Sequence, residues 1–222
     1  MVSKGIAWRW LVLMLACCGL VGSLLTGPAD AKKRPRKSAC QKLKGKDLAP
    51  ARSLKLVAKR VDSVETDLKG CQLPRGEVHI FAIRLKGDTT TSNFKVESVA
   101  SRWALVSARS DSQYASDLRV WVFDIAKGRV LYTIERWSCM TAATDCAPRP
   151  PDVGKGIVDN IGKSVLAFTD LSTTTITGFG TDGGSKNFDS GPSGDLPASS
   201  LTLSRGVASW LHSGQPRSAQ LP

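Results

Sequence analysis

The chain has 222 residues and a formal net charge of +12, and almost all of this charge lies in one short part of it. Residues 32–60 carry twelve Lys or Arg and one acid, whereas residues 61–222 carry seventeen basic and seventeen acidic side chains. This balance excludes a globular body that is itself strongly basic. The high isoelectric point therefore describes the N-terminal part of the chain.

Residues 1–31 have the pattern of a secretory signal peptide. Lys4 and Arg9 accompany a charge-free, mostly apolar run of sixteen residues from Trp10 to Leu25, and Ala29-Asp30-Ala31 has the small-x-small pattern of a cleavage site. A membrane-spanning helix needs about 20 such residues. We therefore expect a signal helix that is removed after Ala31, and a protein that is secreted or associated with the cell envelope.

Two features of the same region favour a retained form. The run from Lys32 to Lys37 is more basic than the chain's start, which by the positive-inside tendency would hold that flank in the cytoplasm. In addition, Leu15-Ala16-Cys17 loosely resembles a lipoprotein box. A membrane-anchored or lipidated protein is therefore the alternative to a cleaved one.

Residues 32–52 are expected to form a basic, flexible arm, because they contain nine basic side chains, two prolines and little apolar content. The arm is a candidate for contact with an anionic cell-wall polymer or lipid headgroups. The candidate contact residues are Lys32, Lys33, Arg34, Arg36 and Lys37. Residues 32–60 contain no aromatic side chain on which single-stranded bases would stack, so no specific nucleic acid is expected. The alternative is a solvated linker.

Residues 53–222 read as one all-β, mostly antiparallel domain. Short apolar runs rich in Val, Ile, Thr, Phe and Trp recur between Gly, Pro, Asp, Asn and Ser, and no window beyond the signal has helical periodicity. The predicted strands are 54–58, 78–85, 94–99, 103–108, 118–125, 130–134, 157–161, 165–169, 173–179, 201–203 and 207–212.

The predicted strand Leu118–Ile125 is apolar at both parities, so it should be covered on both faces, as between stacked sheets. The hairpin after it should turn at Ala126-Lys127-Gly128, with the glycine in a left-handed conformation. A weak repeat aligns residues 96–106 with 158–168 and 200–210, and the first two copies are followed by another hairpin. Four strands per unit is the organisation of propeller blades.

The Asp124–Gly128 hairpin resembles those of YVTN and WD40-like propellers. Residues 40–48, 70–76 and 201–222 resemble uncharacterised secreted proteins of high-GC, actinobacterial-type bacteria. This resemblance implies a propeller-like fold of about three to four blades, which is too few to assure a closed ring. It implies no activity.

Four cysteines follow the signal, an even number that suits an oxidising compartment. Three pairings are available to them. We favour Cys40 with Cys71 and Cys139 with Cys146, because each pair lies within one local segment. A zinc site is the alternative, but neither pair has the usual C-x₂₋₄-C spacing.

The sequence predicts no catalytic, cofactor-binding or metal-binding residue. His79 and His212 are expected as strand histidines, and no G-x-S-x-G elbow accompanies them. Gly162-Lys163-Ser164 resembles only the end of a P-loop and is expected to be a turn. Asp182, Asp189 and Asp195 are candidates for either calcium ligation or turn formation. Trp103, Trp121, Trp137 and Trp210 are candidates for either sugar stacking or core packing. In both cases we favour the structural role.

These patterns predict an exported, non-catalytic binding or interaction domain of the bacterial envelope. The alternative is a secreted propeller-type hydrolase that acts on glycans or esters. Two facing carboxylates suffice for glycoside hydrolysis, and sequence order does not exclude such a pair. A third possibility is a partial propeller that another chain completes.

Overall fold

The computed structural model describes residues 38–48, 53–61, 65–74, 76–84, 92–111, 115–139 and 151–222. The expected signal segment 1–31, Cys146 and the five candidate polyanion contacts between Lys32 and Lys37 lie outside the described residues. No helix in the described part of the chain is long and apolar enough to cross a membrane.

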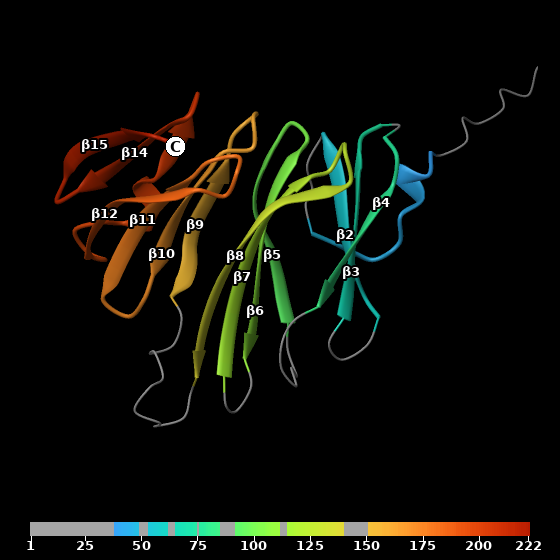
Figure 1. Ribbon diagram of the computed structural model, residues 1–222, viewed down its shortest axis with the longest axis horizontal. Helices are drawn as coiled ribbons and strands as arrows, with labels where there is room; N and C mark the ends of the chain where they lie inside the picture. The colour runs from blue at the N-terminus through green and yellow to red at the C-terminus, as the bar shows by residue number, and fades with distance from the viewer. Residues whose placement is uncertain are drawn as a thin grey trace, which may run out of the picture. The chain divides into compact units, whose positions relative to one another are not determined.

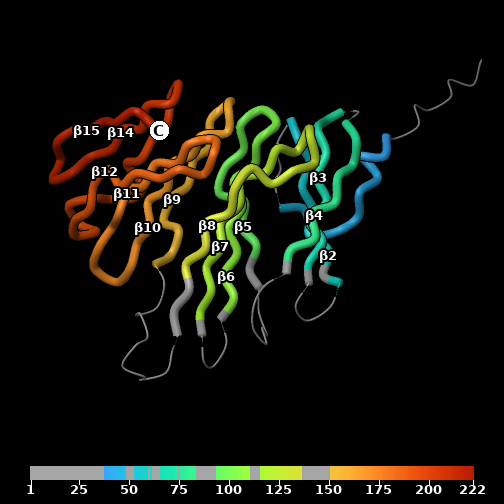
Figure 2. Tube along the Cα trace, viewed as in Figure 1, coloured from blue at the N-terminus to red at the C-terminus, as the bar shows by residue number. Residues whose placement is uncertain are grey.

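The described residues form four antiparallel sheets, and the strands of each sheet follow one another in chain order (Figures 1 and 2). Sheet A contains β1 (Lys46–Asp47), β2 (Leu54–Arg60), β3 (Glu65–Gln72) and β4 (His79–Arg84), and sheet B contains β5 (Ser92–Ala100), β6 (Trp103–Asp111), β7 (Ala115–Asp124) and β8 (Arg129–Cys139). Sheet C contains β9 (Asp152–Val158), β10 (Ser164–Thr169), β11 (Thr173–Phe179) and β12 (Ser185–Pro192), and sheet D contains β13 (Thr202–Ser204), β14 (Val207–His212) and β15 (Gln215–Gln220). Short 3₁₀ turns η1 (Cys40–Lys42) and η2 (Ala198–Ser200) complete the elements.

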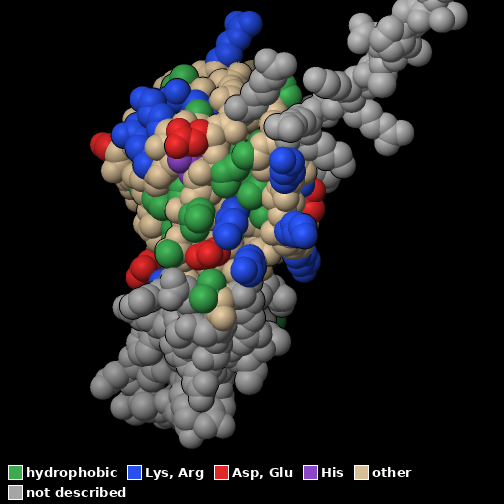
Figure 3. Space-filling model, turned by 90° about the vertical axis from the view of Figure 1, so that its right-hand side faces the viewer, with side chains coloured by type: hydrophobic (Ala, Val, Ile, Leu, Met, Phe, Trp, Pro, Cys, Tyr) green, Lys and Arg blue, Asp and Glu red, His purple; other side chains and the backbone are tan. Residues whose placement is uncertain are grey.

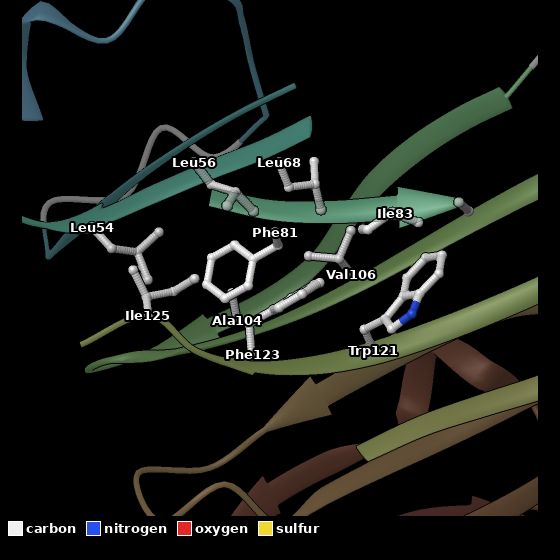
Figure 4. Close-up of a cluster of buried hydrophobic side chains, with 11 residues drawn as sticks. Leu54, Leu56, Leu68, Phe81, Ile83, Ala104, Val106, Trp121, Phe123 and Ile125 are labelled. Carbon is white, nitrogen blue, oxygen red and sulfur yellow. The ribbon is translucent and has the colours of Figure 1, made fainter. Parts of the chain in front are cut away.

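Hydrophobic clusters join consecutive sheets. The first cluster packs Leu56, Leu68 and Phe81 of sheet A against Phe123 and its neighbours in sheet B (Figure 4). A second cluster joins sheets B and C, and a third joins sheets C and D. The all-β, antiparallel prediction is therefore confirmed. The four sheets are not closed into a ring within the described residues.

Strand β7 has the predicted two-faced burial. Trp121 and Phe123 belong to the cluster between sheets A and B, whereas Leu118, Val120 and Val122 belong to the cluster between sheets B and C. Alternate side chains of a strand point to opposite faces. A strand that is apolar at both parities therefore needs a sheet on each side, as it has here.

The predicted hairpin turns are also present. Gly128 has φ of 63°, and a Cβ at this position would lie 2.3 Å from the His79 ring. The aligned repeat segments form the β5–β6, β9–β10 and β13–β14 hairpins. Each of these turns contains a residue with positive φ: Ser101 in the first, Gly162 in the second, and Arg205 and Gly206 in the third.

One predicted strand was misplaced. Residues 157–161 were expected to be a strand, but β9 ends at Val158 and residues 159–163 form the turn to β10. The Asp159 carboxylate accepts hydrogen bonds from the backbone N–H groups of Ile161 and Lys163, which stabilises the turn. Ile161 is consequently exposed in spite of its hydrophobic side chain.

Candidate functional site

The basic side chains of sheet A gather on the face that points away from sheet B. Because Leu54, Leu56 and Leu68 fill the cluster under the sheet, the alternation of β2 and β3 places Lys55, Lys59 and Lys69 on its other face. Segment 38–48 adds Lys42 and Lys44, which are exposed. We call Lys42, Lys44, Lys55, Lys59 and Lys69 the basic face.

Part of the expected arm lies on this sheet. Cys40 is disulfide-bonded to Cys71, so this predicted pairing is confirmed. Strand β1 pairs with β2, and the Lys55 ammonium donates a hydrogen bond to the Leu43 carbonyl at 3.1 Å. Residues 38–48 of the arm, which was expected to extend to residue 52, are thereby held against the domain. The physical reason is that the disulfide and the strand pairing fix two points of this segment.

The excess of positive charge is specific to this part of the fold. The described residues of segment 38–48 and sheet A (38–48, 53–61, 65–74 and 76–84) carry eight basic and four acidic side chains. The described residues of sheets B to D and their connections (92–111, 115–139 and 151–222) carry twelve and eleven. Within the basic face, Lys69 lies 3.8 Å from Asp67. Figure 3 looks onto this side of the molecule and shows Lys and Arg side chains around hydrophobic ones.

A second polar cluster links sheets C and D. The Asp189 carboxylate of β12 accepts hydrogen bonds from the Trp210 indole N–H at 2.7 Å and from His212 Nδ1 at 2.9 Å, both on β14. Phe188, next to Asp189, stacks on Trp210 with 5.9 Å between the ring centroids. The β11–β12 register shifts beside Asp189, and such a bulge re-aims the side chains next to it.

The pKa of Asp189 is the balance of opposing effects, of which partial burial is the largest and raises it. Hydrogen bonds from Trp210 and His212, the charge of His212 and a hydrogen bond from the Ser190 backbone N–H act in the opposite direction, and together they place the pKa below its usual value of 3.8. The carboxylate is thus held in its charged form at the junction of two sheets. Sequence reasoning missed this pair because the two residues lie on strands of different sheets, and the only available signal was the presence of a histidine and an aspartate.

The Asp189–His212 pair has the geometry that orients a general base, because a carboxylate fixes one imidazole nitrogen. A hydrolytic triad also needs a nucleophile on the other nitrogen. Among the described residues, no serine, threonine or cysteine forms a hydrogen bond with His212 Nε2. The contacts that the cluster makes join β12 of sheet C to β14 of sheet D.

Replacing Asp189 with alanine is expected to destabilise the domain by about 1–3 kcal/mol at neutral pH, because the buried Trp210 N–H loses its acceptor. Since the folded-state pKa of Asp189 is lowered, its carboxylate stabilises the fold above about pH 4 and loses this effect as the pH falls through the folded-state pKa. Urea unfolding of both proteins between pH 6 and about pH 2.5 measures this. An equal pH dependence in the two proteins would contradict the assignment.

The remaining predicted residues have structural positions. Trp103, Trp121 and Trp210 are buried, as core packing requires, and the Trp137 side chain is outside the described set. Asp182 accepts a hydrogen bond from Gly184 within its own turn, and Gly162-Lys163-Ser164 is a turn leading into β10.

His79 packs on Gly128. Cys139 ends β8, but its predicted bond to Cys146 lies outside the described residues. No group of three or more His, Cys, Asp or Glu side chains suited to a metal ion occurs in the described ranges.

The comparisons with known proteins add no assignment to this geometry. No family model, no curated protein and no solved structure matches the chain.

Proposed function

We propose that this protein is an exported, non-catalytic binding domain of the cell envelope whose basic face contacts an anionic surface or polymer. The observation that carries the proposal is the concentration of lysines on the outer side of sheet A, while the rest of the described fold is nearly neutral. The basic run from Lys32 to Lys37 directly precedes this segment and would add to the same attraction.

Export is part of the proposal. The signal pattern of residues 1–31 supports it, and so does the Cys40–Cys71 disulfide, because such bonds persist in oxidising compartments. We also propose a relationship to β-propellers, supported by three four-stranded meanders that pack face to face and by the repeated first hairpin of sheets B, C and D.

A secreted hydrolase is the second candidate, and the Asp189–His212 pair is the observation that favours it. Binding is the better supported function for two reasons. Asp189 also holds the indole of the buried Trp210, and the described part of the chain supplies no nucleophile to the histidine. Both facts fit a role in joining two sheets.

A charge-neutralising variant tests the proposal. The triple variant Lys42→Gln, Lys44→Gln and Lys59→Gln is expected to bind anionic vesicles or a soluble wall polyanion about ten- to hundred-fold more weakly at low salt, since each lysine near an anionic surface contributes about 1 kcal/mol. The attraction should weaken as salt is added, because the Debye length is about 8 Å at physiological ionic strength. Retention across a salt series measures both effects.

The matched control removes three exposed charges from other sheets, in the variant Lys127→Gln, Lys186→Gln and Arg217→Gln. It has the same net charge as the test variant, so it separates a local face from overall charge. Equal weakening in both variants would refute a specific basic face. Unchanged binding in both would refute electrostatic binding by the domain.

A further inference from the structure

We infer that the anionic partner of the basic face is a lipid membrane surface, into which Ile80 of β4 inserts while the lysines contact headgroups. This inference rests on the proposed function and deepens it. The evidence is the set of apolar side chains that share the outer face of sheet A with the lysines.

Ile80 lies on the outer face and is unusually exposed. Its neighbours along β4, Phe81 and Ile83, face sheet B and are buried, whereas Ile80 is 59% exposed. In the pairing of β3 with β4, Ile80 lies directly opposite Lys69, so the two side chains are on one face. The basic face therefore borders an uncovered isoleucine.

Two further apolar residues extend this surface. Ala82 follows Ile80 on the same face and is exposed, and it pairs with Asp67, which in turn pairs with Lys59. Val61 directly follows β2 and is 55% exposed. The apolar residues and the lysines thus lie within the same few strand positions.

Among the described residues, segment 38–48 covers the β2 side of the outer face and not the β4 side. Segment 38–48 lies over the β2 side, where Cys71 and Val57 are almost completely buried and Gly45 approaches the Val57 side chain. At Ile80, two strands from β2 in the sheet, the exposure is high. Within the described part of the chain, the β4 side is therefore the exposed part of the face, where a partner can bind.

The combination of charges and apolar side chains favours a membrane over a hydrated polymer. A wall polyanion attracts lysines but offers no apolar phase to an isoleucine. A bilayer surface offers both, because apolar side chains enter the boundary of the acyl chains while lysines extend their ammonium groups to the headgroups. Leu171, by contrast, is exposed in the turn between β10 and β11 and does not lie on a strand face with lysines.

The test uses protein recovered from cells that express the full chain, and vesicles of phosphatidylcholine with or without 30% phosphatidylglycerol as an experimental choice of about physiological charge. Ile80→Ser is expected to bind the anionic vesicles roughly fivefold to tenfold more weakly. The variant lacks the exposed apolar surface, about half of the isoleucine side chain, that would otherwise move from water into the bilayer. Binding to a soluble polyanion should be unchanged. Leu171→Ser, which removes an exposed leucine from sheet C, is the matched control and should bind as the unmodified protein does.

A second variant reports on insertion itself. Ile80→Trp should show a blue-shifted emission difference on anionic vesicles and quenching by brominated lipid. Unchanged vesicle binding by Ile80→Ser, with weaker binding of the lysine triple variant to both vesicles and polyanion, would overturn the membrane inference and leave the proposed function standing. If the Ile80→Ser variant and the lysine triple variant both kept full binding to vesicles and to the polyanion, the membrane inference and the proposed function would both be overturned. A concentration-dependent dimer that Ile80→Ser abolishes would also overturn the inference, because a second copy would then cover the face.

Discussion

Replacing Phe123 with alanine is expected to destabilise the domain by about 3–5 kcal/mol, one of the two largest effects that the fold predicts for a small change. Phe123 is fully buried in the cluster between sheets A and B, and its ring lies 4.7 Å from that of Phe81. It also lies 6.4 Å from the ring of Trp121. Truncation therefore removes buried apolar surface and leaves a cavity in the middle of a sheet-to-sheet interface (Figure 4).

Chemical unfolding monitored by circular dichroism measures this change, because single domains have total stabilities of about 5–15 kcal/mol. Leu171→Ala is the control, since Leu171 is fully exposed at a turn and its truncation should change stability by less than about 0.5 kcal/mol. If the two variants unfolded at the same denaturant concentration, sheets A and B would not pack through Phe123.

The position of Phe123 illustrates which parts of the fold the sequence predicts. Strand β7 was predicted with both faces covered because its two parities are each apolar, and the interfaces with sheets A and C follow from that pattern. Strands β1, β3 and β15 were not predicted, and β12 was implied only by the hairpin expected after residues 158–168. Strand β15 is an edge strand made of polar residues, Pro and Ala, whereas β3 lies between β2 and β4 but interrupts its apolar residues with charged ones and a glycine, so neither strand has a continuous apolar pattern.

The candidate site divides in the same way. The basic segment was evident from composition, and the Cys40–Cys71 bond followed from the nearness of the two residues in the chain. The pairing of segment 38–48 with β2 was not predicted, because β1 consists of only two charged residues and has no strand pattern of its own. The exposure of Ile80 was equally hidden, since in sequence it is one apolar residue of an apolar run and only the strand's facing decides its environment.

Removing the Cys40–Cys71 disulfide is expected to destabilise the domain by about 3–4 kcal/mol, in the loop-entropy view of a crosslink between residues 31 positions apart. Both half-cystines are fully buried, so the double variant Cys40→Ala and Cys71→Ala avoids leaving a single reactive thiol in the fold. Denaturant unfolding compares the variant with the bridged protein. The bridged protein under a strong reductant should lose at least this amount of stability, because the reductant also opens the predicted Cys139–Cys146 bond.

The same variant also tests the link between the bond and the basic face. The disulfide holds η1 over Cys71, and β1 pairs with β2 over only two residues, which is too short to hold segment 38–48 in place without the crosslink. We therefore expect trypsin to cleave after Lys42, Lys44 or Lys46 at least tenfold faster in the variant. The reason is that the free energy of local unfolding of segment 38–48 is lowered while sheets B to D stay folded. Equal cleavage rates would mean that strand pairing and the Lys55 contact with Leu43 are sufficient. Cleavage spread over all four sheets would mean instead that the crosslink supports the whole domain, since Leu48 is the residue of segment 38–48 that packs against the cluster between sheets A and B, and the other two clusters contain no residue of the segment.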